Sequence, residues 1–128
     1  MRMFSKLTLA LALAGVAIAA PAVAHPKLVS ATPAADASVK ATTRIVLVFS
    51  EKLMAPLSGA TLIMTGMPGM QNHPDMKMSG VTAKVGADGK SLELVSAKPL
   101  PAGSYRIDWH VVGGDTHRIT GQHRFNVG

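Results

Sequence analysis

The chain has 128 residues, a length that suits one domain. It contains no cysteine, which excludes both a disulfide framework and thiolate metal sites. The net charge is +6, but the basic residues are scattered and only 4% of the residues are aromatic. Because nucleic-acid-binding surfaces combine a basic stripe with stacking residues, we predict no nucleic-acid partner.

The first 24 residues have the features of a secretory signal peptide. Two basic residues precede an apolar run over residues 7–20, and Ala-Val-Ala at residues 22–24 supplies a cleavage signal of small residues. The run is too short and too rich in alanine for a membrane span. We therefore predict a signal peptide over residues 1–24 and a mature domain over residues 25–128, whose net charge is reduced to +4 by the loss of the two basic residues.

Short segments rich in β-branched and aromatic residues follow along the mature chain. We predict strands over residues 27–31, 44–50, 60–65, 81–86, 91–96, 103–112 and 118–127. Asp88-Gly89 lies between two of these segments and is a hairpin signal. No stretch shows a sustained helical pattern. About seven short strands with turns between them predict an all-β protein, a single antiparallel Greek-key β-sandwich or barrel of the immunoglobulin-like kind.

The last two predicted strands alternate clearly enough for their faces to be assigned. The residues expected to face the core are Tyr105, Ile107, Trp109 and Val111 in the first strand, and Ile119, Gly121, His123, Phe125 and Val127 in the second. We expect Trp109 to be the main core anchor and His123 to be a hydrogen-bonded histidine at the core edge. His110 falls on the opposite face and is expected to be solvated, and Met54 is expected to pack.

The stretch Met64–Met78 holds five of the eight methionines. Four methionines and one histidine recur at every third position, namely Met64, Met67, Met70, His73 and Met76. Glycines and prolines interrupt any helix, so we predict an irregular loop that carries thioethers. Thioether sulfur favours Cu(I) over harder ions, and one imidazole suits the same ion. The alternatives are an adaptable methionine-rich surface for a partner protein, or methionines that fill gaps.

A second group of candidate ligands combines a turn with the new N-terminus. Asp115 and His117 are two residues apart, which places both on one side of an extended segment, although an aspartate in a turn also commonly caps its own backbone. Cleavage after residue 24 would make His25 the first residue, and its α-amine and ring Nδ1 can chelate one ion. Amine, imidazole and carboxylate suit Cu(II), with an affinity that falls as acid protonates the nitrogens.

Together these features resemble the CopC/PcoC family of periplasmic copper-resistance proteins. The resemblance covers essentially the whole mature chain. It rests on His25, on Phe-Ser-Glu at residues 49–51, on the M-x-x-M-x-x-M loop, and on W-x-V-V-x-x-D-T-H-x-I-T-G at residues 109–121. It implies a seven-stranded Greek-key sandwich with two separate copper sites.

The resemblance also implies the ligands of each site. The implied Cu(II) ligands are His25, Asp115 and His117, with Glu51 as a candidate neighbour. The implied Cu(I) ligands come from Met64, Met67, Met70, His73 and Met76, with Met78 as a substitute. His73 follows the third methionine by three residues, where the family commonly has a spacing of two. Which methionines would bind copper beside His73 is therefore left open.

The function implied is that of a periplasmic copper-binding protein for copper resistance or homeostasis, and not an enzyme. Such a protein sequesters copper or passes it to an inner-membrane copper transporter or another periplasmic copper protein, as a monomer or a copper-bridged dimer. One alternative is a histidine-brace copper mono-oxygenase, because an N-terminal histidine paired with a second one resembles that centre. Such an enzyme needs an open coordination position on the copper for oxygen, and Asp115 would occupy that position. The other alternative, a methionine-rich interaction module, predicts no copper binding.

Overall fold

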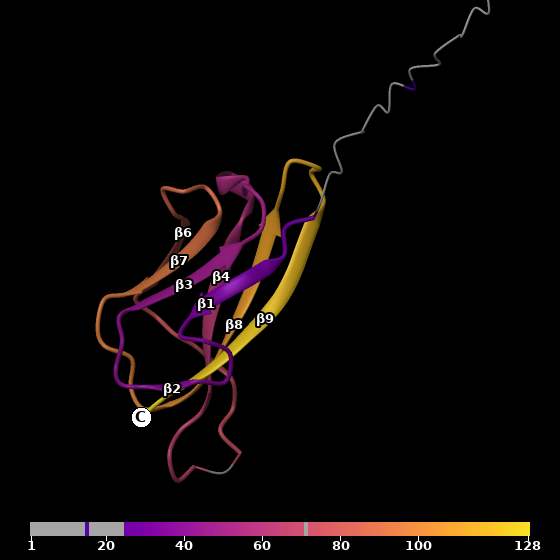
Figure 1. Cartoon of the computed structure of the whole chain (residues 1–128). Helices are drawn as coiled ribbons and strands as arrows, with labels where there is room; N and C mark the ends of the chain where they lie inside the picture. Colours follow the sequence, from indigo (N-terminus) through magenta and orange to yellow (C-terminus); the bar gives the residue numbers. More distant parts are fainter. Residues whose placement is uncertain (1–14, 16–24, 71) are drawn as a thin grey trace, which may run out of the picture.

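The computed structural model describes residues 15, 25–70 and 72–128 (Figure 1). The predicted signal peptide over residues 1–24 thus lies outside the described residues, apart from Gly15. Within these described ranges the regular elements are nine strands and one short 3-10 turn, η1. They are β1 (Leu28–Thr32), β2 (Ser38–Val39), β3 (Arg44–Phe49), η1 (Ala55–Leu57), β4 (Gly59–Gly66), β5 (Met76–Lys77), β6 (Val81–Val85), β7 (Ser91–Ser96), β8 (Gly103–Val112) and β9 (Arg118–Val127). In this part of the chain, the structure contains no helix of the length and apolarity that a membrane span requires.

The strands form two sheets that pack face to face (Figure 1). One sheet has the order β1-β3-β7-β6 and the other has the order β2-β9-β8-β4-β5. Consecutive strands β3 and β4 lie in different sheets, as do β7 and β8, so the chain crosses between the layers as in a Greek key. The orders β1-β3-β7-β6 and β9-β8-β4 correspond to the ABED and GFC sheets of immunoglobulin domains. The predicted immunoglobulin-like β-sandwich is confirmed.

All seven predicted strands are present, with bounds within one residue at each end. The two remaining strands, β2 and β5, have two residues each and lie at the edges of the second sheet. β2 pairs in parallel with the end of β9, and β5 pairs antiparallel with β4. Both therefore depend on contacts with distant parts of the chain, which no local sequence pattern records.

The core lies between the sheets and follows the predicted alternation. Trp109 is 8% exposed and meets Phe49 edge to face, with their ring centroids 5.0 Å apart. Its indole packs over Gly121, where a Cβ would lie 2.6 Å from Cε2 of the tryptophan. At the start of β8 the buried Tyr105 donates its hydroxyl to the carbonyl oxygen of Pro101, as in the tyrosine corner of immunoglobulin-like sandwiches.

The two strand histidines have different surroundings. His123 is 5% exposed and its Nε2 lies 2.8 Å from the carbonyl oxygen of Pro33, which confirms the predicted core-edge histidine. His110 lies on the outer face as predicted, but its side chain is partly buried and not fully solvated. Its neighbour on β4 is Gly59, and a Cβ there would lie 3.2 Å from Cε1 of the imidazole, so the ring occupies the space that this glycine leaves.

Met54 does not pack into the core as predicted. Its side chain is 40% exposed. The backbone amide of Met54 donates to the carbonyl oxygen of Val112 at 2.7 Å. This hydrogen bond fixes the segment before η1 against the end of β8 while leaving the side chain outside.

Candidate metal centres

Three potential metal ligands meet at one end of the sandwich. Figure 1 shows that the chain before β1 and the turn between β8 and β9 lie at this same end. His25 precedes β1, while Asp115 and His117 lie in the turn between β8 and β9. One ligand atom from each residue lies within 4.8 Å of the others. Nδ1 of His25 is in contact with Oδ2 of Asp115, and Nδ1 of His117 lies 3.6 Å from the same oxygen. The fold thus brings the beginning of the domain to its last turn.

The turn between β8 and β9 separates the two oxygens of its aspartate. The amide of Thr116 donates to the carbonyl oxygen of Gly113 at 3.0 Å, and Thr116 has the left-handed φ of 65° that reverses the chain. Oδ1 of Asp115 accepts a hydrogen bond from the amide of His117 at 3.2 Å, so this aspartate does cap its own turn. Its second oxygen, Oδ2, is left facing the imidazoles.

The N-terminal segment is held next to this turn by Pro26. The proline is fully buried and packs on Gly113, where a Cβ would lie 2.7 Å from its Cγ. The next residue, Lys27, exchanges two hydrogen bonds with Ser50: its amide donates to Oγ at 3.0 Å, and its carbonyl oxygen accepts from the Ser50 amide at 2.8 Å. Residue 25 is therefore positioned by contacts on its C-terminal side.

Oδ2 of Asp115 has the surroundings of a metal ligand. The side chain of Asp115 is 9% exposed, and within the described residues Oδ2 is buried without a hydrogen bond of good geometry. When Nδ1 of His25 is unprotonated, its contact with Oδ2 brings two lone pairs together, which is costly at a buried carboxylate oxygen unless a cation lies between them. Two imidazole nitrogens and one carboxylate oxygen form a donor set that suits Cu(II).

Glu51 is not part of this cluster. Its neighbour Ser50 is hydrogen-bonded to Lys27, and Met54 is hydrogen-bonded to Val112. The segment that contains Glu51 therefore lies at the same end of the sandwich as His25 and Asp115. The carboxylate of Glu51 is nevertheless not among the atoms that meet within 4.8 Å. A contribution from Glu51 stays a prediction.

The methionine-rich stretch lies at the opposite end of the sandwich (Figure 1). Met64 belongs to β4 and is 1% exposed, and Met76 in β5 pairs directly opposite to it. Met78 packs against the core, and its amide donates to the carbonyl oxygen of Leu62 at 2.9 Å. Met64 lies in the strand predicted over residues 60–65, whereas the prediction of a loop is wrong at Met76 and Lys77, which pair with β4 as β5.

The middle of the stretch does expose thioethers. Met67 is 39% exposed and Met70 is 53% exposed, and both line a hollow of about 350 Å³ beside Ser104. Met76 is 46% exposed on the edge strand. His73 is partly buried, and its Nδ1 has no hydrogen-bond partner within the described residues. The structure thus gathers two of the predicted thioethers at one hollow and leaves a third accessible nearby in the sequence.

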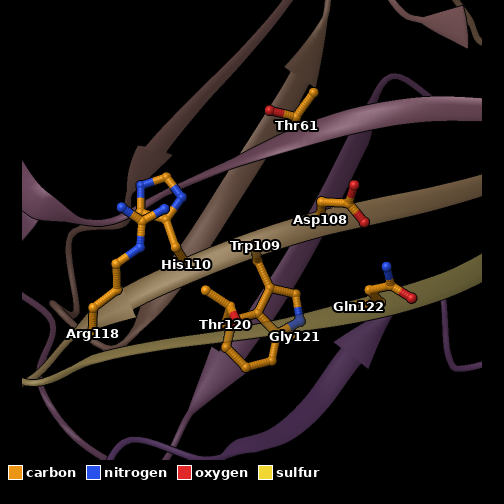
Figure 2. Close-up of a pocket in the computed structure, with 8 residues that line it drawn as sticks. All are labelled: Thr61, Asp108, Trp109, His110, Arg118, Thr120, Gly121 and Gln122. Carbon is orange, nitrogen blue, oxygen red and sulfur yellow. The ribbon is translucent and has the colours of Figure 1, made fainter.

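A larger hollow of about 650 Å³ lies on the outer face of the second sheet (Figure 2). Its lining consists of Thr61, Asp108, Trp109, His110, Arg118, Thr120, Gly121 and Gln122. Figure 2 shows the guanidinium of Arg118 beside the ring of His110, and burial together with this charge lowers the pKa of His110. The lining offers one imidazole, one carboxylate and no thioether, and among the described residues it does not form a cluster of three metal-ligating side chains.

Comparison with known proteins places the chain in a family. The profile of the CopC domain matches residues 28–128. Copper resistance protein C of Escherichia coli is 49% identical over 110 residues, which cover 86% of each chain, and that of Pseudomonas syringae pv. tomato is 46% identical over 114 residues, or 89% of each chain. The crystal structure of PcoC, described as a methionine-rich copper resistance protein from Escherichia coli, matches with a TM-score of 0.75 at 47% identity, over 82% of this chain and all of that one. The chain therefore belongs to the CopC domain family.

Proposed function

We propose that this protein is a periplasmic copper-binding protein that takes Cu(II) as cargo at its mature N-terminus. The proposal is carried by the approach of ligand atoms from His25, Asp115 and His117 to within 4.8 Å of one another. The choice of copper is supported by this donor set and by the names of the relatives, which are copper resistance proteins.

Signal cleavage completes the proposed Cu(II) site. Removal of residues 1–24 frees the α-amine of His25, which together with the ring Nδ1 of the same residue forms a chelate. Asp115 supplies a negative charge that offsets part of the charge of the ion, and His117 supplies the second imidazole. The amine and the imidazoles bind copper only when they are unprotonated, so the affinity falls as the pH is lowered.

The proposed Cu(I) site uses the exposed thioethers of Met67, Met70 and Met76 with the imidazole of His73. Thioethers are neutral soft ligands, which suits reversible binding of Cu(I). Met64 and Met78 pack against or within the core, so their sulfurs would reach an ion only if the edge strand β5 moved.

The role that fits these two sites is binding and exchange of copper, without catalysis. The protein would contribute to copper resistance by sequestering the ion in the periplasm or by handing it to a membrane transporter or another periplasmic copper protein. An oxygenase would need an open position on the metal, and Asp115 occupies one in the proposed site.

The proposal is tested by titration of Cu(II) into protein that begins at His25, beside a version that retains Ala24. Electron paramagnetic resonance of the first should give a one-to-one tetragonal signal with nitrogen couplings that the second lacks. The two chains differ by one residue outside the folded domain, so any difference reports on the amine. Equal binding by both versions would refute the amine ligand, and absence of binding in both would refute the Cu(II) site.

A further inference from the structure

Arg106 fastens the end of the methionine-rich loop to the outer face of the second sheet. Its Nη1 donates to Oδ2 of Asp75 at 2.8 Å, while its Nε and Nη2 donate to the two oxygens of Asp108 at 2.8 and 3.3 Å. The arginine side chain is only 16% exposed. Asp108, and after it Asp75, raise the pKa of this guanidinium, so it stays charged. We call these three residues the Arg106 clamp.

The clamp fixes the orientation of the residues next to Asp75. Met76 follows Asp75 directly, and adjacent residues of an extended chain point to opposite faces. Because Asp75 is held on the outer face, Met76 is turned to the other face, where it lies opposite Met64. His73 precedes Asp75 by two residues and is separated from it only by Pro74, whose φ is restricted.

Apart from the clamp, this part of the chain is held by the short pairing of β5 with β4 and by the hydrogen bond from the Met78 amide to the carbonyl oxygen of Leu62. β5 has two residues, and its register with β4 comprises only the pairs of Lys77 with Ile63 and of Met76 with Met64. Strand ends with few pairs open readily, and ordering them on binding costs conformational entropy. A fork of charge-assisted hydrogen bonds on the partly buried Arg106 reduces that cost before the ion arrives.

We infer that the Arg106 clamp positions His73 and Met76 for the Cu(I) site, so that Arg106 and Asp75 determine Cu(I) affinity without touching the ion. This inference rests on the proposed function. Asp108 orients the guanidinium by occupying Nε and Nη2, which leaves Nη1 directed at Asp75.

The test uses the variants Arg106→Gln and Asp75→Asn of the mature protein, with Arg124→Gln as the matched control. Arg124 lies directly opposite Arg106 on β9, and within the described residues it forms no ion pair. We expect the dissociation constant for Cu(I), measured by competition with bicinchoninate, to rise about threefold in both clamp variants and to stay unchanged in the control. In copper-free protein, amide hydrogen exchange at His73 and Met76 should be faster in the clamp variants.

The salt dependence of Cu(I) affinity is a second test, which a role of the clamp in folding alone would not affect. Added salt should weaken Cu(I) binding by the wild type and by Arg124→Gln, because it screens the ion pair, and should have less effect on both clamp variants. Faster exchange with unchanged Cu(I) affinity would overturn the inference while leaving the thioether site intact. A wild-type protein that binds no Cu(I) would refute the thioether site itself, and with it any role of the clamp in copper binding.

Discussion

The two carboxylate oxygens of Asp115 have different partners, and this division allows a selective substitution. Oδ1 accepts the hydrogen bond that closes the turn, and Oδ2 faces His25 and His117. An asparagine can keep the first contact through its amide oxygen, but it carries no charge. We therefore expect Asp115→Asn to preserve the turn while removing a charge from the proposed Cu(II) site.

We expect Asp115→Asn to lower Cu(II) affinity by about tenfold or more, since even substitutions beside a metal ligand typically cost that much. Thermal unfolding without copper should be nearly unchanged because the turn is kept. Competitive Cu(II) titration measures the first quantity and circular dichroism the second. Asp36→Asn, which removes the same charge from an exposed turn, serves as the control. Equal affinity in the wild type and Asp115→Asn would exclude this carboxylate as a ligand.

His110 predicts a pH dependence of folding stability. Burial, and then the charge of Arg118, lower its pKa below the ordinary value of 6.5. Above that pH the imidazole is neutral in both states. As the pH falls through 6.5, the unfolded chain binds a proton before the folded one does, so stability is lost. Urea unfolding at pH 7.5 and 5.5 should show a larger loss for the wild type than for His110→Gln, and equal losses would contradict the stated cause.

At the scale of single elements, the start of β8 depends on a side-chain hydrogen bond. Tyr105→Phe keeps the stacking of this ring on Phe125, whose centroid is 5.4 Å away, and removes only the hydroxyl bonded to Pro101. We expect the free energy of unfolding to fall by about 1 kcal/mol, because the hydrogen bond from the Tyr105 hydroxyl to the Pro101 carbonyl is lost. Urea denaturation measures this loss. Copper binding at the other end of β8 should not change, and a decrease there would show that the corner also shapes the turn at Asp115.

The long strands could be predicted because each carries its own alternation or β-branched run. The elements β2 and β5 could not, since two residues are too few for a period. Met64 satisfies two patterns at once: it continues the alternation of Leu62 within β4, and it begins the three-residue spacing of the loop. The structure shows that the strand pattern decides its burial.

The candidate ligands were predictable in part. Asp115, His117 and His25 were predicted to form one site because signal cleavage and the turn spacing each point to metal chemistry, and their side chains do meet. The ion pair between Arg106 and Asp75 joins residues far apart in the chain, and both residue types are common on surfaces. Only the register of the sheet reveals that pair.

At the scale of the whole molecule, β8 separates the two proposed copper sites. Gly103 begins the strand beside the hollow lined by Met67 and Met70, and Val112 ends it before the turn that carries Asp115. Ten residues of strand span about 30 Å at about 3.3 Å per residue. Sites this far apart, with no shared side chains, should behave independently.

We therefore expect Met67→Leu with Met70→Leu to weaken Cu(I) binding and to leave Cu(II) binding at the wild-type level. Retention of Ala24 should weaken Cu(II) binding and leave Cu(I) binding at the wild-type level. The combined variant should weaken the binding of each ion as much as the corresponding single change does. Titration of each ion into all four proteins completes the cycle. A loss of both ions from either change would indicate one shared site and contradict the two-site proposal.

The packing of Pro26 on Gly113 has a consequence for the proposed signal cleavage. Because the contacts that hold residue 25 all come from the folded domain, a molecule cleaved one residue too early would fold as well as a correctly cleaved one. Purity, solubility and unfolding temperature would not distinguish the two products. A preparation with ragged N-termini would instead appear as a fractional Cu(II) stoichiometry in otherwise uniform protein, and mass spectrometry of the intact chain would give the same fraction.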